Sequence, residues 1–459
     1  FLAAGAHTEA RRILNYLQST QDVDGHWSQN MWLDGSPYWS GIQMDESAFP
    51  ILLFDLAWRE KVIQEDELDR YWPMVRQAAS YLVGNGPVTD QDRWEEDAGY
   101  APFTLAVEIA ALLAAADLAE NRADSETAQL LRETADAWNA DIERWTFITG
   151  TDLARKVGVA GYYVRIAPPN VGESGTLSGG YVPIKNRSPG ESSEPASRIV
   201  SPDALAFVRF GLRAADDPRI TDTLKVIDDV LKCDTPFGPA WYRYNDDGYG
   251  EHADGSAYDG TGVGRPWPLL VGERAHYELA AGHQEKAASL LQTMQAFANQ
   301  GGMLPEQIWD SEDIPARELF MGQPSGSAMP LVWAHAEYIK LCRSLRDGRV
   351  FDMPPQPVQR YQQNENVAQY ALWKFSHKRR SIPSNVDLRI GLKFPAVILW
   401  WVNDQSQARR INAKKTSLDF FIADLPTRQL PSGTNIKFII SSPEIAVDTP
   451  GHFQVTIAD

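Results

Sequence analysis

A run of acidic residues offers the first possible chemistry in this chain. The segment 92–100, Asp-Arg-Trp-Glu-Glu-Asp-Ala-Gly-Tyr, places four acids around Trp94, just before an apolar helix predicted to begin at residue 102. Acids before a helix N-terminus stabilise the helix dipole, which is the simpler explanation of such a cluster. Trp94 favours a chemical role, because an indole packed beside a carboxyl group raises the carboxyl pKa, as a general acid requires.

A second carboxylate, Glu306, lies in the segment 301–310, Gly-Gly-Met-Leu-Pro-Glu-Gln-Ile-Trp-Asp. The glycines and the proline predict a loop, with Trp309 close by. A single glutamate on a loop is usually only solvated. Two carboxylates at one mouth of a helical barrel, however, form the pair that hydrolysis of a glycosidic bond requires.

Two other segments are rich in aromatic and hydrogen-bonding side chains. They are 241–251, Trp-Tyr-Arg-Tyr-Asn-Asp-Asp-Gly-Tyr-Gly-Glu, and 27–46, which has the same character. Aromatic faces stack on sugar rings, and Arg and Asp side chains bind hydroxyl groups in pairs. A surface turn with satisfied polar groups has the same composition, so that alternative stays open.

The amino-acid composition excludes some classes of binding partner. The chain of 459 residues has 43 Lys and Arg against 61 Asp and Glu, and its net charge of −18 repels nucleic acid and anionic lipid. The longest uncharged apolar stretch, 395–402, is too short to span a membrane. The 15 Trp, 16 Tyr and 17 Phe suit a neutral polar ligand with flat apolar faces, such as a sugar. We therefore expect no nucleic-acid and no membrane partner.

The common signatures of metal, nucleotide and serine-nucleophile sites do not occur. The sequence contains no HExxH, GxSxG, Walker or calcium-loop motif, and no two of its 8 histidines are spaced i, i+4. Cys233 and Cys342 are far apart and form no CxxC, which excludes a disulfide framework and a cysteine zinc site. We expect no cofactor, and the sequence does not tell whether a structural calcium ion binds.

Helical periodicity dominates the first three quarters of the chain. Apolar and amphipathic helices alternate, which predicts a double-layered helical barrel whose loops line one mouth. The segment 102–119 is apolar or small nearly all round and is predicted to be an inner helix. The Gly-, Pro- and Ser-rich segment 168–201 predicts a long loop. The predicted helices are 8–20, 45–60, 67–83, 102–119, 124–147, 201–215, 219–231, 266–281, 284–300 and 325–346, with a stub at 1–4.

After the proline-rich segment 352–358, apolar residues recur at every second position, as in a β-strand. Leu388, Ile390 and Leu392 alternate with charged residues, and a similar alternation at 453–457 predicts a small β-sandwich. We therefore expect a mainly α chain with a barrel domain at 1–350, a linker at 351–364 and a β-sandwich accessory domain at 365–459.

Three motifs in this order resemble glycoside hydrolase family 15, the glucoamylases, and in particular its bacterial branch with glucodextranase. They are Asp-Arg-Trp-Glu-Glu with Gly-Tyr at 92–100, Met-Leu-Pro-Glu-Gln-Ile-Trp-Asp at 303–310, and the segment 325–338. The resemblance covers nearly the whole chain, with the barrel strongest. It implies an (α/α)6 barrel, an exo-acting, inverting hydrolysis that releases β-glucose from the non-reducing ends of α-1,4-glucans, and an extracellular or periplasmic location.

The resemblance also implies roles for single residues. The first glutamate of the Trp-Glu-Glu motif, Glu95, is expected to be the general acid, and Glu306 the general base that activates water. The expected substrate contacts are Trp39, Trp94, Glu96, Arg243 and Tyr244.

One departure from the family pattern concerns the N-terminus. Family members carry an aromatic-Pro-Arg-Asp stretch on the first barrel helix, and bacterial members carry an N-terminal β-domain. This chain starts at Phe1, without an initiator Met or a visible signal peptide. We therefore expect a barrel that lacks its first helix, and an upstream segment or N-terminal domain of the same protein as a partner.

Three other functions remain open at this point. A glucodextranase cleaving α-1,6 bonds and an α,α-trehalase would use the same residues, with specificity set by loops such as 150–201. A non-catalytic carbohydrate-binding protein would need no pair of facing carboxylates.

Overall fold

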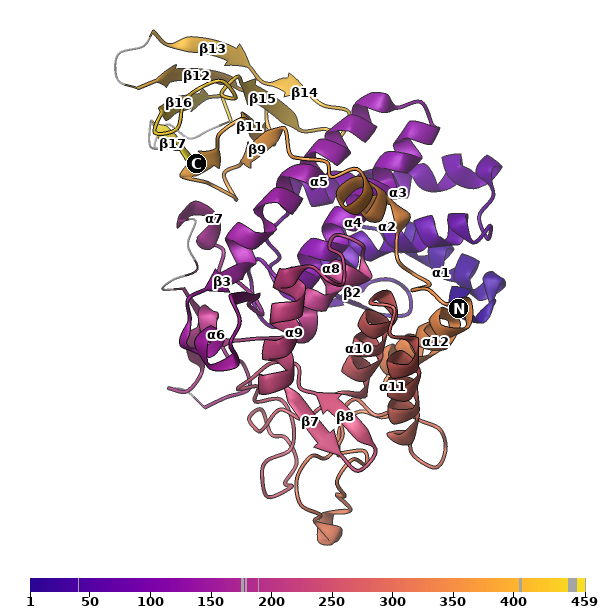
Figure 1. The fold of residues 1–459 in the computed structure, drawn as a ribbon. Coiled ribbons are helices and arrows are strands. Elements are labelled where there is room, and N and C mark those ends of the chain that lie inside the picture. Colours follow the sequence, from indigo (N-terminus) through magenta and orange to yellow (C-terminus); the bar gives the residue numbers. More distant parts are fainter. Residues whose placement is uncertain are drawn as a thin grey trace.

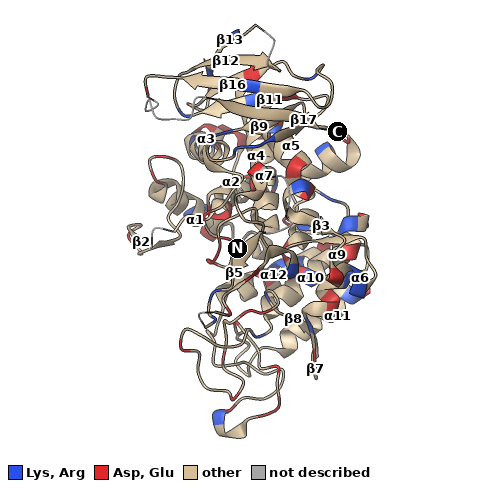
Figure 2. Ribbon diagram, turned by 90° about the vertical axis from the view of Figure 1, so that its left-hand side faces the viewer, with Lys and Arg blue, Asp and Glu red and all other residues tan. Residues whose placement is uncertain are grey.

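The computed structural model describes residues 1–39, 41–174, 177, 180–188, 190–403, 407–444 and 452–458. A helical barrel contains the larger hydrophobic core, and two sheets at the C-terminal end of the chain enclose a second one. The sheets lie over one end of α3, α4 and α5 (Figures 1 and 2). The opposite end of the barrel carries long loops.

The barrel helices alternate in burial up to α11, as the sequence predicts, but α12 buries one face like α11 before it. Helices α2, α4 and α10 are buried over most of their length, whereas α1, α5, α9, α11 and α12 bury one face. The long helices are α1 (His7–Thr20), α2 (Met44–Arg59), α3 (Leu68–Asn85), α4 (Pro102–Asn121), α5 (Ser125–Thr146), α9 (Pro218–Val230), α10 (Pro268–Ala280), α11 (Gln284–Ala296) and α12 (Val332–Asp347). The short ones are α6 (Asp152–Val157), α7 (Val171–Ser174), α8 (Ala206–Arg209) and α13 (Pro355–Pro357).

Helix α4 is the central inner helix. Its sequence has Pro102 at the first helical position, where a missing N–H costs nothing, and small or apolar residues on every face. It packs against α2 on one side and α5 on the other. Length and composition alone would allow α4 to span a membrane, but 89% of its most apolar window is buried within this fold.

Three predicted helices are shorter than expected. The prediction 284–300 is wrong beyond Ala296, where α11 ends. The prediction 201–215 is wrong beyond Arg209, because α8 ends there and Gly211 takes a left-handed conformation (φ 77°). The prediction 325–346 is wrong at its start, because α12 begins only at Val332. Residues 325–331 instead pair with the segment around Glu306, and Pro330 disfavours a helical conformation in the residue before it. The predicted loop 168–201 contains α7 and a small hairpin, β5 (Tyr181–Pro183) and β6 (Ser193–Pro195).

Three more hairpins decorate the barrel, namely β1 (Asn30–Met31) with β2 (Pro37–Trp39), β3 (Phe147–Thr149) with β4 (Gly161–Tyr163), and β7 (Lys232–Thr235) with β8 (Gly238–Trp241). A cavity of about 440 Å³ lies between α2 and α12, with Phe49 and Leu53 of α2 and Lys340 of α12 in its lining.

The C-terminal β-region consists of two sheets with strand orders β10-β17-β16-β12-β13 and β14-β15-β11-β9. The alternation predicted for 388–392 is confirmed, since Leu388, Ile390 and Leu392 are buried between the sheets. The strands are β9 (Tyr370–Trp373), β10 (Ser381–Pro383), β11 (Asp387–Leu392), β12 (Val397–Val402), β13 (Arg409–Asn412), β14 (Lys414–Lys415), β15 (Phe421–Leu425), β16 (Asn435–Ser441) and β17 (Phe453–Ala458).

The segment between barrel and sheets is ordered against the barrel. It contains α13 and a π-helical turn, Val358–Gln363. Gln356 donates to Asp55 of α2 at 2.8 Å, and Arg360 forms two 2.6 Å hydrogen bonds with Asp136 of α5.

Candidate active site

The predicted general acid lies on a loop between α3 and α4, residues 86–100, which we call the acid segment. Its inner turn folds around the buried carboxylate of Asp92, which accepts hydrogen bonds from the backbone N–H groups of Trp94 (3.2 Å) and Glu96 (3.1 Å). Glu95, between them, has a left-handed backbone with φ 64°, uncommon outside glycine. Gly99 and Thr89 pair as an antiparallel bridge that closes the segment.

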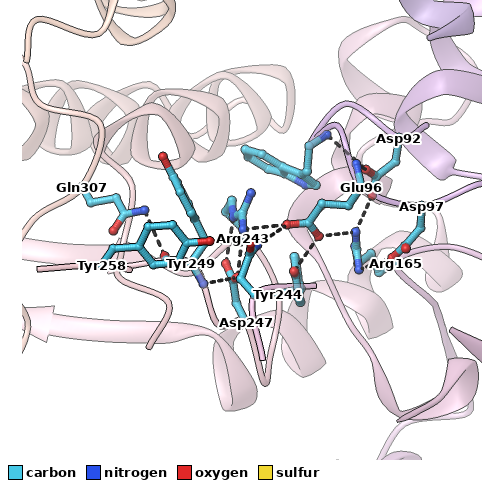
Figure 3. A network of polar contacts seen from close by, with 12 residues as sticks. Asp92, Glu96, Asp97, Arg165, Arg243, Tyr244, Asp247, Tyr249, Tyr258 and Gln307 are labelled. Carbon is cyan, nitrogen blue, oxygen red and sulfur yellow. Dashed lines mark hydrogen bonds and ion pairs between the residues drawn. The ribbon is translucent and has the colours of Figure 1, made fainter. Parts of the chain in front are cut away.

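Glu96 is held in place by a buried network (Figure 3). Its carboxylate accepts hydrogen bonds from Arg165 at 2.8 Å, Arg243 at 3.0 Å and the Tyr244 hydroxyl at 2.6 Å. Burial raises the pKa of Glu96, and the guanidinium groups of Arg243 and Arg165 oppose that shift. The Asn186 side-chain amide is a fourth donor, at 3.3 Å. A carboxylate with four donors on it has little freedom to move, so Glu96 is a fixed acceptor beside Glu95.

Arg243 connects the acid segment to the loop after β8. Its Nε and Nη2 atoms donate to the two oxygens of Asp247, each at 2.8 Å, in a bidentate pair. The guanidinium also lies over the rings of Trp94 and Tyr249, at 5.2 and 4.9 Å from their centroids. These contacts fix the orientation of a cation that would otherwise be flexible.

Glu306 is positioned by the loop that precedes α12. Its backbone N–H donates to Ala328 O at 2.8 Å, and Leu331 N–H donates to Leu304 O at 2.9 Å. The Tyr249 hydroxyl donates to Glu306 Oε2 at 3.2 Å. Burial raises the pKa of Glu306, while the Tyr249 hydrogen bond opposes that rise.

One cavity of about 410 Å³ collects these groups. Of the residues predicted for the site, it is lined by Trp94, Glu95, Glu96, Arg243 and Glu306. Its other lining residues are Arg93, Lys185, Asn186, Tyr249, Trp267, Leu331 and Trp333. The segments around 95, 243 and 306, far apart in the sequence, thus face one space.

Tyr244 and Trp39 do not line this cavity. Tyr244 is buried behind it and supports Glu96 through its hydroxyl. Trp39, at the end of β2, is 53% exposed. Its Nε1 lies beside Gly41 together with the side-chain amide of Gln91, which belongs to the acid segment. The sugar-facing role of Trp39 stays a prediction.

Arg165 was not among the predicted site residues, and Asp92 was predicted only as one of the four acids of the segment 92–100. Arg165 is fully buried and joins Asp92 (2.7 Å), Glu96 and Asp97 (3.0 Å). No local pattern marks a single arginine in the segment after β4, because its partners are about seventy residues away along the chain. Asp247 and Tyr249 do lie in the aromatic segment 241–251 that the composition pointed to.

A metal site is not evident. Within the described ranges, no group of three or more His, Cys, Asp or Glu side chains is arranged to hold an ion.

Comparisons with known proteins identify the family of this chain. Residues 15–343 match the sequence profile of the glycosyl hydrolases family 15. A glucoamylase of Clostridium sp. (strain G0005) is 42% identical over 362 residues, which are 79% of this chain and 47% of that protein. An uncharacterised glycosyl hydrolase of Methanocaldococcus jannaschii is 22% identical over 341 residues, 72% of this chain and 46% of that protein.

Among solved structures, a bacterial glucoamylase complexed with acarbose is 41% identical and superposes with a TM-score of 0.68, over 79% of this chain and 49% of that one. The fold is thus the (α/α)6 barrel and β-sandwich expected from the sequence. The chain spans about half the length of the curated relatives it matches. Because the family profile covers most of the chain, this protein belongs to glycosyl hydrolases family 15.

Proposed function

We propose that this protein hydrolyses α-1,4-glucans from their non-reducing ends and releases β-glucose with inversion at the anomeric carbon. The observation that carries the proposal is that Glu95 and Glu306, from two distant loops, line the same cavity. Hydrolysis of a glycosidic bond needs such a pair of carboxyl groups. The name of the 42% identical relative, a glucoamylase, supports the same activity.

In this mechanism Glu95 donates its proton to the glycosidic oxygen as the bond from that oxygen to the anomeric carbon breaks. Glu306 takes a proton from a water molecule, whose oxygen forms the new bond on the opposite face of the sugar. Burial raises the pKa of Glu306 and makes it a stronger base once it is ionised.

The surrounding residues provide binding rather than proton transfer. Trp94, Trp267 and Trp333 offer flat faces for the glucose ring. The Arg243–Glu96 pair adds fixed polar groups in the same space.

Proton NMR of the anomeric signals tests the proposal directly. The protein is mixed with maltotriose and, separately, with isomaltotriose, and the first glucose released is identified as α or β. Early β-glucose, faster from maltotriose, is the expected result. Early α-glucose contradicts the inverting mechanism, and faster release from isomaltotriose indicates a glucodextranase instead.

Replacing the base tests its assignment. Glu306→Gln is expected to lower kcat by roughly a thousandfold with little change in KM, because the base acts mainly in the transition state. Glu312→Gln, an exposed change six residues away, is the matched control and should behave like the parent. An unchanged kcat in Glu306→Gln would remove this residue from the mechanism.

A further inference from the structure

A turn of the C-terminal β-region contacts both ends of the acid segment. The turn, residues 374–377, follows β9 and is closed by hydrogen bonds in both directions between the backbones of Lys374 and His377, each at 3.1 Å. It lies against the barrel near α5, which packs on β9 (Figure 1). The family profile ends at residue 343, so the match to the family assigns this turn no role.

Lys374 holds the first end of the acid segment. Its buried ammonium group donates to the backbone carbonyls of Val83 and Gly86, the latter at 2.7 Å. These carbonyls end α3 and begin the acid segment. Burial lowers the pKa of Lys374 to about 7, and the nearby Glu108 carboxylate opposes that shift. In either protonation state the N–H groups of Lys374 hydrogen-bond the last carbonyls of the helix and fix where the chain leaves it. Trp138 of α5 packs against the same ammonium group, with its ring centroid at 5.6 Å.

His377 holds the second end. The hydroxyl of Tyr100, the last residue of the segment, is hydrogen-bonded to His377 Nδ1 at 2.5 Å. Both side chains are buried, and the Tyr100 ring stacks on Trp145 of α5 at 4.7 Å. Burial and the nearby Arg379 keep the pKa of His377 well below its usual value, so the contact joins a neutral imidazole to a neutral phenol.

We infer that Lys374 and His377 are positioning residues that hold the acid segment so that Glu95 points at the glycosidic oxygen. The inference rests on the proposed function. Glu95 lies on a loop and has a left-handed backbone, so neither a helix nor a strand fixes its direction. Small displacements of a catalytic group are costly, since about 1 Å can lower a rate by roughly a hundredfold. The β-region thereby contributes to catalysis without touching the substrate.

Hydrogen–deuterium exchange tests the contact independently of activity. Tyr100→Phe keeps the ring on Trp145 and removes only the hydroxyl, His377→Leu removes the hydrogen-bonding partner of that hydroxyl, and His377→Asn keeps a polar partner in its place. We expect exchange in peptides covering 86–100 to rise about tenfold in the first two variants and to return toward the parent in His377→Asn. His452→Gln, an exposed histidine of the same β-region, is the control.

Two substrates then test the effect on Glu95. Cleavage of maltose requires protonation of the leaving glucose oxygen. The fluoride ion of α-D-glucosyl fluoride departs without being protonated. In Tyr100→Phe we expect kcat for maltose to fall about tenfold while kcat for the fluoride changes less than about twofold. A merely destabilised protein would lose both activities together.

The outcomes separate the two proposals. Equal losses on both substrates, or unchanged exchange at 86–100 in Tyr100→Phe and His377→Leu, would overturn the positioning role. If the parent protein releases no β-glucose, the proposed function fails, and the exchange measurement still decides whether the turn holds the segment. Lys374→Met tests the other end and should raise exchange first near Gly86.

Discussion

The Tyr249 hydroxyl is expected to set the acidic side of the pH profile. It donates to Glu306 Oε2 at 3.2 Å and so stabilises the ionised carboxylate, although burial keeps the pKa of Glu306 above its usual value. Tyr249→Phe removes that donor and raises the pKa further. Because the base works only when ionised, activity rises with pH through this pKa, and the acidic limb of kcat/KM should move up by roughly half a pH unit.

Tyr258→Phe is the matched control for this prediction. Tyr258 packs edge-on against Tyr249, but its hydroxyl donates to Asn186 rather than to Glu306. The acidic limb of kcat/KM in Tyr258→Phe should coincide with that of the parent. We would measure kcat/KM between pH 3 and 8 for the parent and both variants. If the acidic limb of Tyr249→Phe coincides with that of the parent, the Tyr249 hydroxyl does not affect the pKa of Glu306.

The site residues that lie within short sequence motifs could be predicted, whereas those brought together only by folding could not. Trp94, Glu95 and Glu96 are adjacent in the sequence, and Glu306 lies in a motif of its own, so both groups can be recognised from the sequence. Arg165 was missed because its carboxylate partners come from the segment before α4, and only the packing of the barrel brings them to 2.7–3.0 Å.

At the scale of elements, α4 is expected to be the least tolerant helix. Leu112 is completely buried within it. Leu112→Ala removes buried methyl groups and leaves a cavity, which costs about 3 kcal/mol of unfolding free energy. Thermal and urea unfolding should both report the loss, while kcat of the folded fraction stays near that of the parent, because Leu112 lies outside the residues that line the active-site cavity.

The control for this helix is Leu33→Ala, at a fully exposed leucine in the turn between β1 and β2. The same deletion of methyl groups there should change the unfolding free energy by less than about 0.5 kcal/mol. Equal losses at the two positions would mean that α4 is not the buried centre of the barrel.

Helix periodicity predicted the elements better than their ends. The all-apolar pattern of α4 is a local signal and was read correctly. The helix predicted from residue 124 begins at Ser125, and Asp124 caps it by accepting from Thr127 N–H at 3.2 Å. The start of α12 is not local. Residues 325–331 leave the helix because they pair with the backbone around Glu306, a contact that helical periodicity cannot show.

At the scale of the whole molecule, two hydrophobic cores are joined by polar contacts. Arg389 of β11 pairs with Glu133 of α5 at 2.7 Å, and Arg379 pairs with Asp141 of α5 at 2.9 Å. Lys374 and His377 belong to the same interface. Alternating apolar residues predicted the sheets, but the charged residues that dock them on the barrel carry no periodic signal.

Breaking the Arg379–Asp141 pair is expected to destabilise the whole molecule. Both side chains are buried, so Arg379→Met leaves the Asp141 carboxylate with only Arg144, at 3.2 Å, and should cost roughly 3 kcal/mol of unfolding free energy. Asp141→Leu added to Arg379→Met removes the uncompensated charge and should recover at least about half of that loss. Arg428→Met, at a half-exposed arginine whose ion pair with Asp387 spans 3.6 Å, is the control and should unfold like the parent. Calorimetric unfolding measures the stability of each variant. If the double variant is no more stable than Arg379→Met, the loss in Arg379→Met does not come from an uncompensated charge on Asp141.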